Sequence, residues 1–347
     1  MSKTKTKRFF QIAMPMVGLV SLIIFPPWNL VKAWIMPLPD TVQEQVEEAI
    51  SYGIDGMIVY VDQRGKEPAL YAAGWKNREN QIPADPNAMF KIASISKLYI
   101  AAAVAKLAQA EVISLDKSLA EYLPDFADKI ENSAQITLRM LVRHRSGIPN
   151  YTDHPDYPWT DPFKKNADTY QLVFGQPADF APDEKYAYSN TNYLLIGEIL
   201  DRTLGYSHHQ YIREEILQPL GLSHTYSLMR EIDPNELMSG YFVGYAPDIK
   251  GNDFIQPGGS MISTAQEVGI FLRALNDETL LAEEEQAIYS SIYEYGHTGL
   301  LPGYQSHAFY HPDIDAVVVQ FVNTSGGTMW NVSEIFYNRI VKILGKK

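Results

Sequence analysis

The chain has 347 residues, an apolar fraction of 46% and a formal net charge of −12. This length and composition predict a globular protein with a substantial core. The acidic balance argues against a nucleic-acid partner, which would require basic patches. The absence of cysteine excludes thiol catalysis, disulfides and thiolate metal sites.

The N-terminal segment has the pattern of an export signal. An apolar run at residues 9–25 follows a basic head formed by Lys3, Lys5, Lys7 and Arg8. The basic flank of such a segment stays in the cytoplasm, which places the rest of the chain outside. We therefore expect residues 1–38 to hold an export signal or membrane anchor plus a proline-rich linker. The protein is then either anchored to the membrane or, after cleavage near Ala33, secreted or periplasmic.

Residues 39–347 are predicted to form one α+β domain. Strand-like runs occur near both ends, at residues 56–61, 69–73, 307–310 and 316–323. Helical patterns occupy residues 41–51, 94–110, 263–276 and 329–344, and a mainly helical region covers roughly residues 110–255. Strands at both ends with helices between them predict an antiparallel sheet that combines both termini, flanked by helices, with an inserted helical region.

Ser94 and Lys97 form the first motif that could take part in catalysis. Ser94 precedes a strong helix-forming stretch, and backbone N–H groups at a helix N-terminus favour negative charge on its oxygen. Residues three apart share a helix face, which brings the Lys97 amine beside the hydroxyl. A lysine acts as a base only if its pKa is lowered. The alternative is a serine N-cap with a solvated lysine.

Tyr188 and Asn190 form the second motif, the only Tyr-x-Asn among 22 tyrosines. A phenol beside a lysine can relay a proton between a nucleophile and a leaving group. The Asn190 amide can orient the lysine and bind a substrate carbonyl. The alternative is a turn before the helical stretch at residues 193–204.

The third motif is His297-Thr298-Gly299 in a strand-like stretch. A glycine in a strand often marks the close approach of another backbone or a ligand. The backbone N–H groups of Leu300 and Ser94 could together form an oxyanion hole. His297 would add partial positive charge and the Thr298 hydroxyl could bind a carboxylate; the alternative is an edge strand with a surface histidine.

Together these motifs resemble the serine β-lactamase and penicillin-binding protein superfamily. Tyr188-Ser189-Asn190 is similar to its class C β-lactamase-like branch, which includes D,D-carboxypeptidases, esterases and D-aminopeptidases, and the runs at residues 141–149 and 257–264 match that branch too. The resemblance covers residue 41 to the C-terminus. It implies Ser94 as the acylated nucleophile and Lys97 with Tyr188 as the general base pair, and it implies substrate contacts by Asn190 and by His297, Thr298 and Gly299.

Two positions bear on the substrate. His297 in the first place of the third motif resembles the D,D-peptidase type. Leu300 stands where many relatives that bind a carboxylate have Thr or Ser, so an ester or another neutral substrate would suit it. We expect a serine hydrolase without metal or cofactor that acts on a small-molecule or peptide amide or ester. A D,D-carboxypeptidase-like peptidase ranks first, a carboxylesterase second and a class C-type β-lactamase third.

Other classes have less support. The chain has no Gly-x-Ser-x-Gly, His-Glu-x-x-His or phosphate-loop motif. A catalytically silent relative that binds cell-wall peptide remains an alternative, because a fold does not determine a function.

Overall fold

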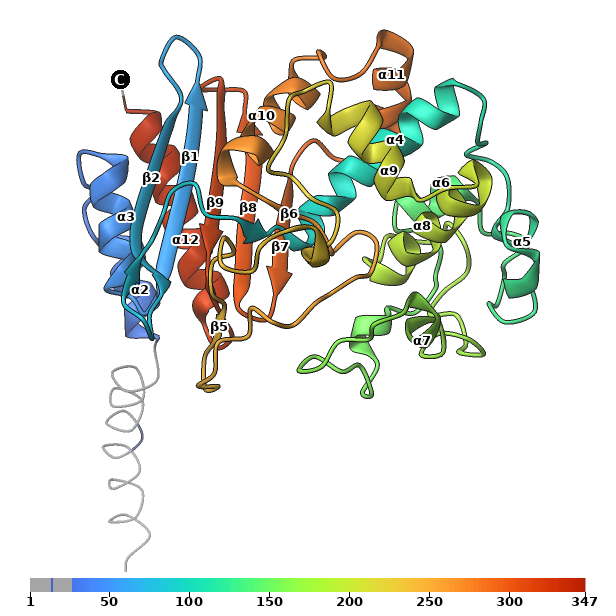
Figure 1. Ribbon diagram of the computed structural model, residues 1–347, viewed down its shortest axis with the longest axis horizontal. Helices are drawn as coiled ribbons and strands as arrows, with labels where there is room; N and C mark the ends of the chain where they lie inside the picture. Colours follow the sequence, from blue (N-terminus) through green and yellow to red (C-terminus); the bar gives the residue numbers. More distant parts are fainter. Residues whose placement is uncertain (1–13, 15–26, 347) are drawn as a thin grey trace, which may run out of the picture.

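The computed structural model describes residue 14 and residues 27–346. Its centre is a six-stranded antiparallel sheet in the order β3-β2-β1-β9-β8-β7 (Figure 1). Strand β1 pairs with β9, with Met57 opposite Val322, so the sheet joins the two ends of the chain as predicted. The strands are β1 Gly56–Gln63, β2 Ala69–Asn77, β3 Ile82–Pro83, β7 His297–Leu301, β8 Tyr304–His311 and β9 Ala316–Val322.

Three helices cover one face of the sheet: α2 Trp28–Ile35, α3 Val42–Ile50 and α12 Met329–Leu344. Helix α3 begins at a capping box, in which Glu44 N–H donates to Thr41 Oγ1 at 3.2 Å and Thr41 N–H donates to the Glu44 carboxylate at 3.0 Å. Apolar side chains from these helices and from β1 and β9 form one buried cluster.

Helices α4 Ser96–Gln109, α10 Ala265–Asn276 and α11 Glu283–Ile292 lie on the other side. The ring of Tyr99 in α4 stacks on Phe271 in α10 with centroids 3.8 Å apart. The larger buried cluster includes these rings and continues into the helical region. Helix α4, which carries Lys97 and directly follows the turn that contains Ser94, is thus fixed in the protein core.

The predicted helical region contains five short or medium helices: α5 Leu119–Tyr122, α6 Leu138–Val142, α7 Asn166–Tyr170, α8 Asn190–Leu204 and α9 His208–Ile212, the last of which continues into the π-helical turn η4 Arg213–Leu217. Short 3₁₀ turns are η1 Ala93–Ile95, η2 Pro124–Phe126, η3 Tyr151–Asp153 and η5 Met229–Glu231. Two small sheets pair β4 Phe90–Lys91 with β6 Ile262–Ser263, and β5 Tyr241–Phe242 with β10 Thr324–Ser325.

Part of the predicted proline-rich linker is helical. Helix α2 starts after Pro27 and ends before Pro37. Proline is favoured at the start of a helix and just beyond its end, so these prolines mark helix ends. The predicted export segment at residues 9–25 falls outside the described residues except for Met14. Across residues 27–346, none of the helices has the length and hydropathy to cross a membrane.

Candidate active site

Ser94 lies on a tight turn between β4 and α4. The preceding Ala93 has a φ of +50°, a conformation that costs free energy for a residue with a Cβ. Ser96 holds this turn, because its Oγ donates to the Ala93 carbonyl at 2.6 Å and accepts from Met261 N–H at 3.2 Å. Ser94 is thereby placed at the N-terminal end of α4, in the 3₁₀ turn η1, as the sequence predicts.

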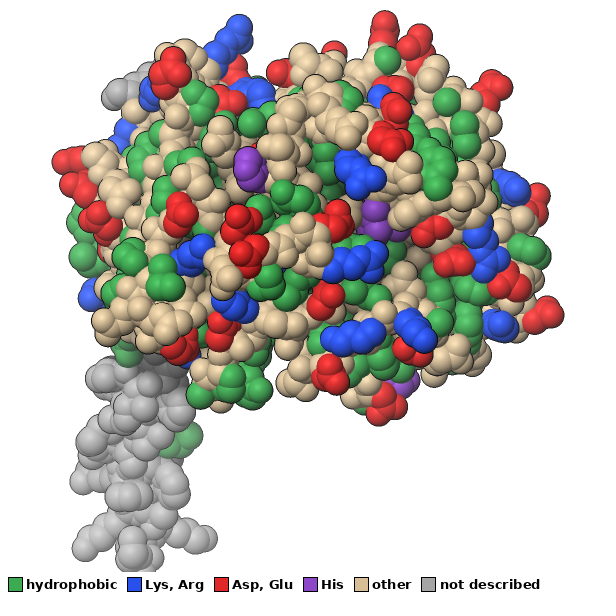
Figure 2. All heavy atoms as spheres, in the orientation of Figure 1, with side chains coloured by type: hydrophobic (Ala, Val, Ile, Leu, Met, Phe, Trp, Pro, Cys, Tyr) green, Lys and Arg blue, Asp and Glu red, His purple; other side chains and the backbone are tan. Residues whose placement is uncertain are grey.

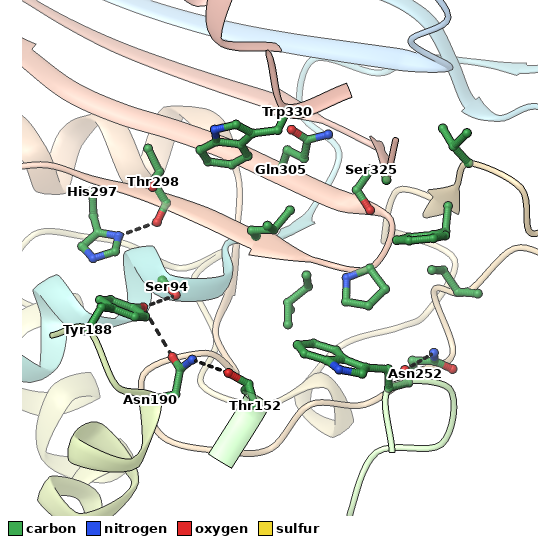
Figure 3. Close-up of a pocket in the computed structure, with 18 of the residues that line it drawn as sticks. Ser94, Thr152, Tyr188, Asn190, Asn252, His297, Thr298, Gln305, Ser325 and Trp330 are labelled. Atoms are coloured by element: carbon green, nitrogen blue, oxygen red, sulfur yellow. Dashed lines mark hydrogen bonds between the residues drawn. The ribbon is translucent and has the colours of Figure 1, made fainter. Parts of the chain in front are cut away.

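The hydroxyl of Ser94 lies within hydrogen-bond distance of two ionisable groups, Lys97 and Tyr188, of which Figure 3 shows Tyr188. Lys97 Nζ is 3.1 Å from Ser94 Oγ, and the Tyr188 hydroxyl donates to the same oxygen at 2.8 Å. Lys97 is one helical turn along the chain from Ser94, whereas Tyr188 comes from the segment just before α8. The first two motifs therefore converge on one atom.

Burial controls the ionisation of Lys97 and Tyr188. Besides Ser94, Lys97 Nζ donates to Asn190 Oδ1 at 2.9 Å and to the Gly258 carbonyl at 2.7 Å. These neutral oxygens do not offset the loss of water, and burial lowers the pKa of Lys97 to about 7. Burial raises the pKa of Tyr188, an effect opposed by its hydrogen bond to Ser94. Lys97 is therefore the group that can be a neutral base near pH 7, while Tyr188 keeps its proton and can relay it.

The 257–264 run contributes Gly258, whose carbonyl accepts a hydrogen bond from the Lys97 amine. The φ of Gly258 is +80°, and a Cβ at this position would lie 2.8 Å from Tyr193 Cβ and 3.1 Å from Lys97 Cγ. Only glycine allows this loop to bring its carbonyl against the Lys97 amine.

His144, in the 141–149 run, packs behind Tyr188. Its ring centroid is 4.5 Å from that of Tyr188, and its Nδ1 accepts from Ser189 N–H at 3.2 Å. Burial lowers the pKa of His144 to about 3, with further contributions from Lys97 and His297. His144 is thus a neutral side chain that fixes the backbone between Tyr188 and Asn190. The run containing His144 was noted in the sequence, but this contact could not be read from it.

Two further residues orient Asn190. Its Nδ2 donates to Asn150 Oδ1 at 3.3 Å and to Thr152 Oγ1 at 3.2 Å, and its backbone N–H donates to Asn150 Oδ1 at 2.9 Å. These bonds turn Asn190 Oδ1 toward Lys97. Sequence reasoning missed Asn150 and Thr152, which lie just after the 141–149 run and carry no motif of their own.

Strand β7 brings the third motif to the edge of the site. A Cβ on Gly299 would lie 2.4 Å from the Ile92 carbonyl and 3.1 Å from Ala93 Cβ. The glycine therefore permits the close backbone approach that the sequence predicts. β7 is the edge strand, and Leu300, 53% exposed, lies along it.

The other side chains of β7 alternate between its two faces. Gly299 is opposite Ser306, whose Oγ bonds to the Ile92 carbonyl, so His297 lies on the Ser94 face. Thr298 and Leu300 are opposite His307 and Gln305 and lie on the α12 face. Burial, followed by the charge of Lys97, lowers the pKa of His297 to about 4, which makes it a neutral ring at pH 7.

An open cavity of about 1080 Å³ surrounds these groups. Among the described residues that line it are Ser94, Tyr188, Asn190, His297 and Thr298. Glu294 is the one carboxylate in this lining, which includes neither lysine nor arginine. No cluster of three or more His, Asp or Glu side chains able to hold a metal ion occurs within the described residues. The chemistry available here is nucleophilic attack by an activated hydroxyl.

A serine hydroxyl, a lysine amine and a phenol at a cavity, on an antiparallel sheet with an inserted helical region, define a serine hydrolase. The chain belongs to the Beta-lactamase family, whose model matches residues 38–291. This match contains the Ser94 and Tyr188 motifs and ends before β7.

Related sequences and structures agree with this family. Penicillin-binding protein 4* of Bacillus subtilis (strain 168) is 26% identical over 190 residues, which are 54% of this chain and 41% of that protein. Protein flp of Staphylococcus aureus (strain MW2) is 28% identical over 189 residues, 53% of this chain and 38% of that protein. The matched region thus spans about two fifths of these curated relatives.

Solved structures share the fold. The D-amino acid amidase of Ochrobactrum anthropi SV3, complexed with L-phenylalanine amide, superposes with a TM-score of 0.77 at 22% identity, covering 91% of this chain and 99% of that chain. The octameric penicillin-binding protein homologue from Pyrococcus abyssi gives a TM-score of 0.76 at 21% identity, covering 88% and 77%. At this identity the likeness establishes the fold.

Proposed function

We propose that the protein hydrolyses an ester or amide through an acyl-enzyme on Ser94. The observation that carries the proposal is the convergence of Lys97 Nζ and the Tyr188 hydroxyl on Ser94 Oγ, at 3.1 and 2.8 Å, in an open cavity. Ser94 Oγ attacks the carbonyl carbon while its proton passes to the neutral Lys97 amine. Tyr188 relays a proton to the leaving group, and water then cleaves the acyl-enzyme by the same route in reverse.

We propose roles for the other residues of the site from where they lie around Ser94. The backbone N–H groups of Ser94 and Leu300 are proposed to hold the oxyanion, which the turn at η1 and the edge position of β7 favour. Asn190 holds Lys97 and contacts the substrate carbonyl. His297, Thr298 and Gly299 form the strand edge along which the acyl group lies.

We infer that the substrate is neutral where it lies along β7. Glu294 is the charged side chain in the described lining, and Leu300 offers no hydroxyl after the third motif. A terminal carboxylate would therefore lack a cationic partner. On this ground we rank an ester or simple amide as the first candidate substrate. The D,D-carboxypeptidase activity that was ranked first from the sequence becomes second, and β-lactam hydrolysis stays third.

A side-by-side turnover assay tests the function. We expect the purified protein to hydrolyse a p-nitrophenyl ester or an amino acid amide at least tenfold faster than a D-Ala-D-Ala peptide or a cephalosporin. Ser94→Ala should abolish each activity, whereas Ser291→Ala, an exposed serine in α11, should change none of them. Turnover that survives Ser94→Ala would refute the mechanism, and no turnover of any substrate would favour a silent binding protein.

We also propose that residues 1–38 direct export and hold the domain at residues 39–347 outside the cytoplasmic membrane. The basic head and apolar run of the sequence support this. Fractionation of expressing cells, with an intact mass of the product, distinguishes an anchored chain from a cleaved one. Recovery of the full-length chain in the cytoplasmic fraction alone would contradict export.

A further inference from the structure

The cavity continues past the catalytic groups to the far side of the edge strand. Ser94, Tyr188 and Asn190 lie on one side of β7 in Figure 3, and Trp330 and Gln305 lie on the other. All five line the same cavity. Because Thr298 and Leu300 are paired with His307 and Gln305, their side chains lie on this far face, toward α12.

The part of the cavity beyond β7, here called the α12 arm, is bordered by apolar side chains from four separate segments. Its apolar lining residues are Phe242, Val243, Leu300, Phe309 and Trp330, and the polar side chains of Thr298, Gln305 and Ser325 line it as well. The Trp330 ring is held in place by His307, whose ring centroid lies 5.1 Å away in a stacked arrangement. Such a preformed recess, lined mainly by apolar side chains with a few polar groups, suits the hydrocarbon part of a ligand.

The outer wall of the α12 arm is fixed by backbone pairing. Strand β5 pairs with β10, and Val243 N–H donates to the Ser325 carbonyl at 2.8 Å. Gly326 has a φ of +90°, and a Cβ there would lie 2.9 Å from the Phe242 ring. Glycine thus lets the turn before α12 fit closely under the β5 loop.

The rim of the α12 arm is also apolar. Val243 is 47% exposed and Tyr245 is 45% exposed. Figure 2 shows hydrophobic side chains at the lower edge of the molecule, where Figure 1 places β5. Val243 and Tyr245 therefore present apolar surface to a ligand at this edge of the cavity.

We propose that the α12 arm binds the acyl chain of a neutral fatty ester whose carbonyl lies at Ser94. This inference rests on the proposed acyl-enzyme function and adds its substrate class. Each methylene transferred from water into the arm stabilises the bound state by about 0.8 kcal/mol, which corresponds to a roughly fourfold higher kcat/KM per methylene. The enzyme then prefers medium-length chains over acetate.

The test is a series of p-nitrophenyl esters from acetate to decanoate, assayed below their micellar concentrations. Wild-type kcat/KM should rise about fourfold per methylene until the arm is filled. Val243→Lys places a charge in the arm and should lower kcat/KM for octanoate at least tenfold while acetate changes less than twofold. Tyr245→Lys, at the rim, should act in the same direction.

Val112→Lys is the matched control. Val112 is 46% exposed, close to the 47% of Val243, and it is not among the lining residues of the cavity. It should leave the whole series unchanged. Melting temperatures verify that each variant is folded.

Two results would overturn the proposal: kcat/KM that does not depend on chain length, or an octanoate-to-acetate ratio that Val243→Lys and Tyr245→Lys leave unchanged. Labelling of Ser94 by a fluorophosphonate separates this failure from failure of the proposed function. A labelled Ser94 without chain-length preference refutes only the α12 arm. An unlabelled Ser94 refutes the acyl-enzyme itself.

Discussion

At the scale of single residues, Lys97 shows how burial lowers the pKa of an amine into the neutral range. Its amine is fully buried and contacts three neutral oxygens. Burial without a compensating carboxylate destabilises the ammonium form, which brings the pKa to about 7. The same burial makes Lys97 a cost to folding, since an unfolded lysine keeps its proton up to its ordinary pKa of 10.5.

Replacing Lys97 by Met should therefore separate activity from stability. We expect Lys97→Met to lower the rate of Ser94 acylation by a factor on the order of 10³ or more, as loss of an activating base does. It should raise the melting temperature at pH 6 to 7, where the cost of the buried ammonium is fully present. This gain should shrink as the pH rises toward 10.5.

Lys106→Met provides the comparison on the same helix. Lys106 is ion-paired with Glu285 at 3.3 Å and has no contact with the site, so its replacement should leave acylation unchanged. Near-normal acylation in Lys97→Met would exclude a base role for Lys97.

The pH dependence of kcat/KM should follow the deprotonation of the Lys97 amine. Only the neutral amine can accept the Ser94 proton, so kcat/KM should rise tenfold per pH unit on the acid side and level off above about pH 8. The burial that lowers the pKa of His297 to about 4 keeps this ring neutral across that range. His297→Asn should therefore leave the apparent pKa near 7, and an acid limb that moves with this substitution would contradict the assignment.

At the scale of elements, the site depends on the contact between β7 and η1. The positive φ of Ala93 turns Ser94 toward the cavity, and Gly299 leaves room for that turn. Residue 299 must be glycine for this packing, because the Ile92 carbonyl occupies the space that a Cβ would need.

Gly299→Ala should push β7 away from η1. The added Cβ would lie 2.4 Å from a backbone oxygen, which cannot rotate away. We expect kcat/KM to fall by roughly 100-fold, since small displacements of an oxyanion donor are costly. Gly251→Ala, whose Cβ would meet no atom within 4 Å, should retain activity; equal activity in both variants would show that the β7 approach is not needed.

The helices and strands with strong local signals were predictable. Helix α4 follows from its Ala- and Leu-rich stretch, and the β1–β2 hairpin from its apolar runs. Helix α8 begins at Asn190, earlier than the stretch at residues 193–204 expected from the sequence. The reason is a tertiary contact: Asn150 Oδ1 accepts a hydrogen bond from the Asn190 N–H at 2.9 Å. A partner 40 residues away cannot be inferred from the local sequence pattern.

At the scale of the whole molecule, the two ends of the chain support the sheet together. Arg339 in α12 is 4% exposed and donates to Gln45 Oε1 at 2.7 Å, to the Met36 carbonyl at 2.7 Å and to the Glu48 carboxylate at 3.2 Å. This one guanidinium joins α12 to α3 and to the segment that follows α2.

Arg339→Met should lower the free energy of unfolding by about 3 kcal/mol, because it leaves Glu48 and buried carbonyls without their donor. Denaturant unfolding measures this change. The rate of fluorophosphonate labelling of the folded protein should remain unchanged, because Arg339 lies on the opposite side of the sheet from α4. Unaltered stability would show that α12, α3 and residues 33–37 do not depend on this contact.

The three motifs proposed to carry the chemistry were readable from the sequence because each is a short run of residues that are adjacent or nearly adjacent in the chain. Their convergence was predicted only through the resemblance to a family. The residues that orient them were not readable: His144, Asn150 and Thr152 act through contacts across about 40 residues of chain. The α12 arm is lined by residues from β5, β7, β8 and α12, so it could not be predicted from any local sequence pattern.

The central claim is that Lys97 and Tyr188 activate Ser94, and covalent labelling tests it most directly. The protein is treated with a fluorophosphonate, digested and mapped by mass spectrometry, with Lys97→Met and Lys106→Met in parallel. We expect a single adduct on the peptide that contains Ser94, formed on the order of 10³-fold more slowly in Lys97→Met and at the wild-type rate in Lys106→Met. Absence of an adduct, or an adduct on another residue, would contradict the account.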